Sequence, residues 1–284
     1  MNAINERPQE DILATVLRAT DPWFPELTGS LVNNGWEALS REMSISPATY
    51  STTNVTRRHA FAPSAGIVAS VPIEQGKFSG FVEFLADDVQ AYFESKDYRF
   101  PNAHEVAERG LTEALSRALE FIALVPSLHA SSSQLIRCVH LLQSTVGECD
   151  ISFSEPGIPF SIFVSVPGID SSNASLRLAE AVIHESMHLQ LSLIEKVAPI
   201  SLSKAPMYYS PWKRSNRDAS GVLHALYVFT VIDAWLKRLP SSADSYSKIR
   251  RHEIAEQFAE ISSFGSADLT EVGNALRRNL LSQH

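Results

Sequence analysis

The sequence contains two histidines with a glutamate beside the first, a spacing suited to metal binding. In the segment IHESMH, residues 183–188, His184 and His188 are four positions apart. On a helix, residues four apart lie on the same face, so both imidazoles can reach one cation while Glu185 lies to one side. Apolar residues surround the motif, and buried imidazoles need partners. The motif therefore predicts a metal site with His184 and His188 as ligands.

Two side chains hold a metal poorly, so we expect a third protein ligand. His224 is the best candidate because it lies in an apolar segment, GVLHALYVF, where an unpaired imidazole is costly. The alternative is a core histidine that hydrogen-bonds a carbonyl group. The other candidates for third ligand are Glu180, one helical turn before His184, and Glu253 and Glu256 further along the chain.

Cationic side chains gather just before His224. The segment YYSPWKRSNRD, residues 208–218, contains Lys213, Arg214 and Arg217 together with aromatic residues. A guanidinium binds a carboxylate through two parallel hydrogen bonds, so this segment is a candidate binding site for a carboxylate co-substrate. The alternative is a solvated loop.

Most of the chain after residue 100 has the apolar periodicity of helices. We expect helices over 102–125, capped by Asn102 and ended by Pro126, and over 131–143, 174–197, 219–239, 243–262 and 267–281. Alternating residues predict strands at 150–154 and 160–166, joined by a turn. The fold class is therefore α+β, predominantly helical with a small antiparallel sheet, and the histidine motif lies on a long central helix.

The first hundred residues are less informative. Residues 8–45 have the pattern of helix and loop, and residues 46–64 have the composition of an exposed connector. Residues 66–73 have the pattern of a short strand near a sheet edge. Residues 81–94 fit a helix or a strand. We interpret residues 1–100 as the N-terminal part of the same domain and residues 101–284 as its metal-binding catalytic part.

Composition excludes several classes of protein. Lys and Arg number 24 against 32 Asp and Glu, a net charge of −8 without a basic run, which argues against nucleic-acid binding. The N-terminal residues do not resemble a signal peptide, and no apolar stretch of about 18 residues predicts a membrane span. Two cysteines are too few for a disulfide framework or a thiolate metal site. We expect a soluble cytoplasmic protein.

Two segments carry a resemblance to a known family. LAEAVIHESMHLQL and YYSPWKRSNRDASGVLHALYVF resemble the HExxH-motif peptide-modifying proteins, 2-oxoglutarate-dependent HExxH-type peptide β-hydroxylases associated with ribosomally made, post-translationally modified peptides. The resemblance is firm over residues 174–235 and extends back to about residue 111. Its second motif consists of Ser210, Pro211, Lys213, Arg217, Gly221 and His224.

The chain departs from the family pattern at two positions of this second motif. Asp218 stands where the family tends to have proline, which alters the turn. Lys213 stands where arginine is common, which leaves Arg217 and Arg214 as the candidates for a bidentate clamp.

The resemblance implies an iron(II)- and 2-oxoglutarate-dependent dioxygenase of natural-product (RiPP) biosynthesis. Its substrate would be a ribosomally synthesised precursor peptide, hydroxylated on a side chain at the β-carbon. His184, His188 and His224 would bind Fe(II), and 2-oxoglutarate would be held by Arg217 with Arg214, Lys213 and Ser210.

Two alternatives stay open beside this hypothesis. In an HExxH zinc metallopeptidase, Glu185 would be the general base for a Zn(II)-bound water, whereas in the dioxygenase it orients a ligand. The chain could instead be a catalytically inactive peptide-binding protein.

Overall fold

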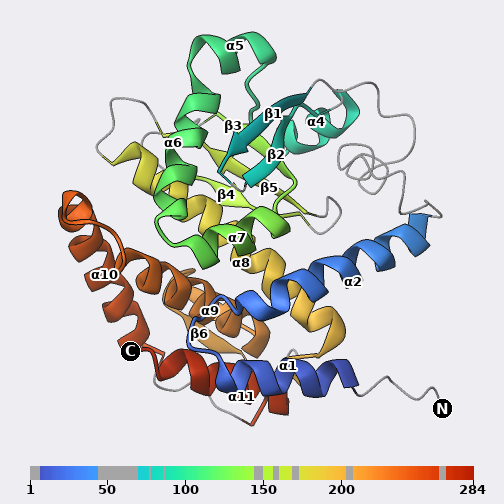
Figure 1. Ribbon diagram of the computed structural model, residues 1–284, viewed down its shortest axis with the longest axis vertical. Helices are drawn as coiled ribbons and strands as arrows, with labels where there is room; N and C mark the ends of the chain where they lie inside the picture. The colour runs from blue at the N-terminus through green and yellow to red at the C-terminus, as the bar shows by residue number, and fades with distance from the viewer. Residues whose placement is uncertain are drawn as a thin grey trace. The chain divides into compact units, whose positions relative to one another are not determined.

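The fold is α+β and mostly helical, as the sequence predicts, and its chain divides into two compact units. The computed structural model describes residues 7–43, 70–76, 78–85, 87–143, 150–155, 160–167, 173–202, 207–261 and 267–284. One unit, here the sheet unit, comprises residues 32–189, and the other, the helical unit, combines residues 1–31 with 190–284. Helix α8 (Ala174–Val197) begins in the sheet unit and ends in the helical unit (Figure 1). The interpretation of residues 1–100 and 101–284 as two parts of one domain stays a prediction.

The sheet unit contains a five-stranded sheet. Its strand order is β1 (Ser70–Gln75), β2 (Phe78–Glu83), β3 (Cys138–Leu142), β5 (Ser161–Ser165) and β4 (Ser152–Phe153). The middle strands β2, β3 and β5 are parallel, and β1 and β4 are antiparallel to their neighbours. The predicted antiparallel pairing of 150–154 with 160–166 is confirmed, and β3 and β2 extend this sheet in parallel, so the five-stranded sheet is mixed, while β6 (Tyr208–Ser210) and β7 (Ser215–Arg217) form a second, small antiparallel sheet.

Strand β3 occupies residues that the sequence analysis assigned to a helix. The helix predicted at 131–143 is wrong in its second half, because α7 (Pro126–Leu135) ends before residues 138–142 form a fully buried strand. Continuous apolar runs are typical of buried parallel strands, and their periodicity cannot distinguish them from a short buried helix. Pro126 begins α7 rather than only ending the preceding helix, because proline is tolerated at the first helical position.

The helix predicted at 102–125 is divided in two. Asn102 caps α5 (Ala103–Glu108) through a reciprocal pair of hydrogen bonds with Glu105, so the predicted cap is confirmed. Gly110 then adopts a left-handed conformation, φ 60°, which ends the first helix before α6 (Leu111–Ala123) begins.

The first hundred residues contain more regular structure than their pattern specifies. Helices α1 (Arg7–Arg18) and α2 (Pro25–Met43) fall within the part predicted as helix and loop. The predicted strand overlaps β1, and residues 81–94 include both the end of β2 and helix α4 (Asp87–Glu94). The predicted connector at 46–64 lies outside the described residues.

The helical unit is built around α9 (Ala219–Leu236), with α10 (Asp244–Ala259) and α11 (Glu271–Leu281) in two of the predicted segments. A short 3-10 turn (Ser241–Ala243) precedes α10. Among the described helices α9 is long and apolar enough to cross a membrane, but 72% of it is buried inside the protein, as in a core helix. Helices α1 and α11 lie side by side (Figure 1), where Asn279 Nδ2 donates to the carbonyls of Val16 and Ala19.

Candidate metal centre

The two histidines of the motif converge on one face of α8. The Nε2 atoms of His184 and His188 are 3.1 Å apart, and the ring centroids are 4.8 Å apart. Both side chains are half-buried, with 28% of the His184 side chain exposed. The predicted juxtaposition is therefore confirmed, and metal binding by this pair stays a prediction.

Neighbouring residues hold this part of α8 within the sheet unit. Ile183 and Met187 are fully buried on α8. Ser186, within the motif, contacts Ser132 of α7 through their hydroxyl oxygens, 3.1 Å apart, and donates to the carbonyl of Ile183. Because both contacting side chains are small, the two helices approach closely, which fixes the direction in which the imidazoles point.

Glu185 is buried next to the histidine pair. It is 2% exposed, and its Oε1 lies 3.9 Å from His184 Nε2. Ser152, on the edge strand β4, donates a hydrogen bond of 2.8 Å from Oγ to the same carboxylate oxygen. A buried carboxylate needs such donors, so β4 fixes the orientation of Glu185. The sequence gives no signal for this role of Ser152 beyond its place in a strand.

The predicted third ligand, His224, has a carboxylate partner in the helical unit. Its Nε2 lies 2.9 Å from Glu195 Oε2, and Ser220 Oγ donates to Glu195 Oε1 at 2.6 Å. Burial acts to raise the pKa of Glu195, but the hydrogen bonds to His224 and Ser220 outweigh it, so this pKa lies below its ordinary value. Glu195 is not among the residues that the sequence predicts for the site, although it follows His188 by seven positions, two helical turns.

The residues proposed as ligands are not gathered into a complete coordination set. Within the described ranges, no three His, Cys, Asp or Glu side chains form a group that could hold a metal ion. The rival candidates Glu253 and Glu256 pair with Arg250 and His252 on α10 and are 50% and 67% exposed. Glu180 is half-buried on α8. His224 remains the best candidate, since only 15% of its side chain is exposed, and its role stays a prediction.

The cationic segment before α9 forms a hairpin. Strands β6 (Tyr208–Ser210) and β7 (Ser215–Arg217) pair so that Tyr208 opposes Arg217 and Ser210 opposes Ser215. Side chains alternate between the faces of a strand, so this register puts Ser210 and Arg217 on the same face. Lys213 and Arg214 are exposed in the connecting turn, where Arg214 has a left-handed φ of 48°.

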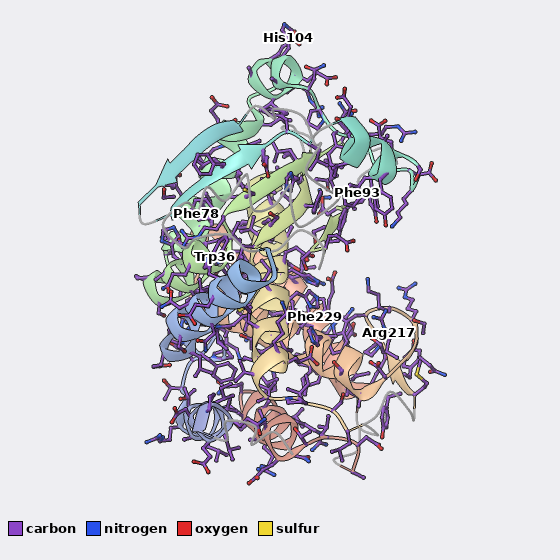
Figure 2. The ribbon with its side chains drawn as sticks, turned by 90° about the vertical axis from the view of Figure 1, so that its right-hand side faces the viewer. Trp36, Phe78, Phe93, His104, Arg217 and Phe229 are labelled. Carbon is purple, nitrogen blue, oxygen red and sulfur yellow. The ribbon has the colours of Figure 1, made fainter. Side chains whose placement is uncertain are left out.

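Ser210 and Arg217 have features that fit a carboxylate ligand. Ser210 is 1% exposed, and its Oγ has no hydrogen-bond partner within the described part of the chain. Arg217 is exposed beside the start of α9 (Figure 2), and its Nε would lie only 3.3 Å from a Cβ on Gly221. The absence of a side chain at Gly221 therefore leaves room for the guanidinium against the first turn of α9, one turn before His224.

Two contacts attach the hairpin to α9. Asp218 caps the helix, accepting a 2.8 Å hydrogen bond from the Gly221 amide, so this departure from the family's proline still starts the helix correctly. The Trp212 ring stacks on Phe229, with centroids 5.1 Å apart and planes within 4°. The turn that bears the cations is thus fixed to the helix that bears His224.

Comparisons with known proteins assign this chain neither a family nor a function. No family model matches the sequence, and no curated protein matches it.

Proposed function

We propose that this chain is an iron(II)- and 2-oxoglutarate-dependent hydroxylase that acts on a side chain of a ribosomally made precursor peptide. The observation that carries the proposal is the 3.1 Å separation of His184 Nε2 and His188 Nε2 on α8. Two ring nitrogens this close are unfavourable if both present lone pairs, so a shared proton or a shared cation must lie between them. Imidazole nitrogens suit iron and zinc alike, and His224 supplies the third nitrogen in this proposal.

The hairpin supplies the groups that 2-oxoglutarate needs. Its distal carboxylate would be anchored by the Arg217 guanidinium, and the Ser210 hydroxyl, buried without a partner among the described residues, supplies a second donor on the same face. Lys213 and Arg214 add positive charge from the exposed turn. A buried hydroxyl without a partner is costly, and a bound carboxylate would remove that cost.

Glu185 has an orienting role in this proposal. Its carboxylate accepts a hydrogen bond from Ser152 and lies 3.9 Å from His184 Nε2, the nitrogen that would bind the metal, so it would orient a group bound to the metal rather than the imidazole ring. When bound, iron and 2-oxoglutarate supply the oxidant: one O2 and one 2-oxoglutarate yield succinate, CO2 and one hydroxyl group on the peptide. This chain's residues bind the co-substrate and exclude water from the buried side of the site.

The test combines metal content with product analysis. The full chain, purified without oxygen and loaded with Fe(II), should release succinate from 2-oxoglutarate in the presence of O2. His184→Ala and His188→Ala should each lose metal without unfolding, whereas His104→Ala, which changes an exposed histidine on α5, should retain it. Full metal occupancy in either motif variant would remove the basis of the proposal.

A zinc peptidase is the second candidate, and the position of Glu185 favours it. A carboxylate 3.9 Å from His184 Nε2 lies where a general base for a metal-bound water belongs. Glu185→Gln distinguishes the candidates, since glutamine keeps the shape of glutamate but cannot accept the proton. A hydroxylase variant retains measurable succinate release, whereas a peptidase variant loses nearly all peptide cleavage. Cleavage by the wild type that disappears in Glu185→Gln would replace the hydroxylase proposal with the peptidase.

A further inference from the structure

A cavity of about 610 Å³ lies in the sheet unit, on the helices and loops around the start of α8. Its walls come from the end of α5 and one side of α6, from Val166 and Pro167 after β5, and from Ala174, Ser175 and Leu178 in the first turns of α8. This volume is within the range of small-molecule binding sites, about 300–1,000 Å³.

The charged residues of the cavity are mainly cationic. Arg109, which caps the end of α5, and Arg117, on α6, both line it, and among the residues that the structure describes Glu108 is the one acidic wall residue. Both arginines are exposed, and no ion pair joins either one to another described residue. Two guanidinium groups against one carboxylate give the described part of the wall a net positive charge on a chain whose net charge is −8. An anion is therefore the ligand charge that this wall favours.

Apart from Ser175, the other described residues that line the cavity are apolar. Leu111, Val166 and Leu178 are 4%, 5% and 1% exposed, so they form a fixed floor that belongs to the core. Ala114 lies between Leu111 and Arg117 on the same side of α6, and its small side chain leaves the cavity wide there. A ligand that fills this space must combine an anionic group with an apolar body.

The cavity is separate from the histidine pair. Ser175 precedes His184 by nine positions on α8, which corresponds to roughly 14 Å along the axis and two and a half turns. The two residues consequently lie on opposite faces of the helix. A ligand at Ser175 does not contact the imidazoles, so the cavity is not the co-substrate site proposed above.

We infer that this cavity is a second binding site, for an amphipathic organic anion whose carboxylate or phosphate group pairs with Arg109 and Arg117 while its apolar body lies on Leu111, Val166 and Leu178. Two guanidinium groups provide the parallel donors that either anion accepts. The inference does not depend on the reaction that the metal centre catalyses.

The experiment measures displacement of the fluorescent probe anilinonaphthalene sulfonate by decanoate, decyl phosphate and uncharged decanol. The wild-type chain should release the probe with both anions and at least about tenfold more weakly with decanol, since decanol lacks the charge. The relative affinities of decanoate and decyl phosphate identify which anionic group the site prefers. Failure of both anions to displace the probe at about 1 mM would overturn the inference.

Variants of the cavity wall locate the site. Arg109→Gln combined with Arg117→Gln should weaken both anions at least about tenfold. The matched control, Lys96→Gln combined with Lys248→Gln, removes the same charge from exposed positions elsewhere and should leave the affinities unchanged. Equal weakening in the control, or none in the arginine variant, would contradict the assignment.

A larger side chain in the cavity tests, independently of the arginines, whether the apolar body of the ligand binds there. Ala114→Phe keeps both arginines and occupies the space beside them, so it should weaken the anions and decanol alike. The iron content of the arginine variant and of Ala114→Phe should match the wild type, because Arg109, Ala114 and Arg117 line a cavity whose described walls include neither His184 nor His188. Normal anion binding in Ala114→Phe would overturn the inference, and it would leave the proposal for the metal centre intact.

Discussion

Glu185 is held by a hydroxyl group from another element, so the metal affinity of the histidine pair should depend on Ser152. Ser152→Ala removes the 2.8 Å hydrogen bond to a buried carboxylate and lets Glu185 turn away from His184. Loss of such an orienting partner typically costs 10–100-fold in metal affinity. Titration of the variant with Fe(II) against a competing chelator measures this loss. Ser116→Ala, which removes a hydroxyl bonded to a backbone carbonyl on α6, is the control, and equal metal affinity in Ser152→Ala and the control would refute the role of Ser152.

Arg217 should determine the affinity for 2-oxoglutarate and not for iron. Truncation in Arg217→Ala removes a charge-assisted hydrogen bond worth about 1.5–3 kcal/mol, so the Kd for 2-oxoglutarate should rise at least about tenfold at unchanged iron content. Arg217→Lys should recover part of the loss, because an ammonium cannot donate two parallel bonds. Isothermal titration of the iron-loaded chain with 2-oxoglutarate measures both effects. An unchanged Kd in Arg217→Ala would eliminate this residue as the anchor.

A substitution at Gly221 tests whether the Arg217 guanidinium needs the space beside the first turn of α9. A Cβ at this position would lie 3.0 Å from Asp218 Oδ1 and 3.3 Å from Arg217 Nε, tighter than side chains normally pack. We expect Gly221→Ala to displace the guanidinium and raise the Kd for 2-oxoglutarate severalfold, while the better helix propensity of alanine limits the loss of stability to about 1 kcal/mol or less. Ala225→Gly, one turn later on α9, controls for changes in the helix itself. A Kd equal to that of the wild type would show that the guanidinium does not need this space.

Within the helical unit, α8 and α9 are joined by a buried chain of hydrogen bonds. The Tyr227 hydroxyl donates to Gln190 Oε1, and Gln190 Nε2 donates to Thr28 Oγ1 at 2.8 Å. All three side chains are buried, and desolvation raises the pKa of Tyr227 well above its usual value, so the hydroxyl stays protonated and a donor. His224 lies one turn before Tyr227 on α9, so these hydrogen bonds contribute to the placement of His224.

Removing the Tyr227 hydroxyl, the first donor in this series of hydrogen bonds, should destabilise the protein measurably. Tyr227→Phe leaves the buried Gln190 carbonyl oxygen without that donor, which costs about 1–3 kcal/mol. Chemical denaturation followed by circular dichroism gives the free energy of unfolding. Tyr209→Phe, which removes a hydroxyl from a 47% exposed side chain, should change it by less than about 0.5 kcal/mol. If Tyr227→Phe and Tyr209→Phe have the same free energy of unfolding, the buried series of hydrogen bonds contributes no specific stability.

The sequence predicts elements well where one local pattern decides the structure. Helices α8 to α11 and the β4/β5 pair follow from apolar periodicity, and Asn102 from its capping pattern. Strand β3 does not, because five buried residues look alike in a helix and a strand until their neighbours in the sheet are known. For the site, spacing alone brings His184 to His188, whereas Ser152 and Glu195 reach their partners through tertiary packing that a single sequence does not encode locally.

At the scale of the whole molecule, the free energy of unfolding should depend on pH through His140. This residue is fully buried on β3, with Nδ1 3.1 Å from the Glu83 carbonyl and Nε2 3.7 Å from the buried Glu83 carboxylate, and burial outweighs the hydrogen bond to the carbonyl and lowers the pKa of His140 from 6.5 to about 4. Between these values the unfolded chain binds a proton that the folded chain does not. The contribution of His140 is therefore complete above about pH 6.5 and decreases by about 3 kcal/mol as the pH falls to about 4.

Denaturant titrations between pH 7 and pH 4 check this dependence. His140→Asn keeps a donor near the Glu83 carbonyl and removes the titrating group, so its stability should fall less steeply over this range than that of the wild type. His104→Asn, which changes an exposed residue at the far tip of the sheet unit (Figure 2), should keep the wild-type slope. A slope in His140→Asn as steep as in the wild type would assign the dependence to other groups.

The pairing of α1 with α11 has a consequence for the order in which the chain folds on the ribosome. Asn279, on α11, donates to carbonyl groups at Val16 and Ala19, so α1 must wait until α11 has been synthesised before it finds its partner. The sheet unit is one continuous segment and needs no such wait. Because contiguous units fold as they are synthesised, we expect the sheet unit, with His184 and His188, to fold before α11 is available to pair with α1. Metal binding that uses His224 on α9 would then follow the folding of the sheet unit.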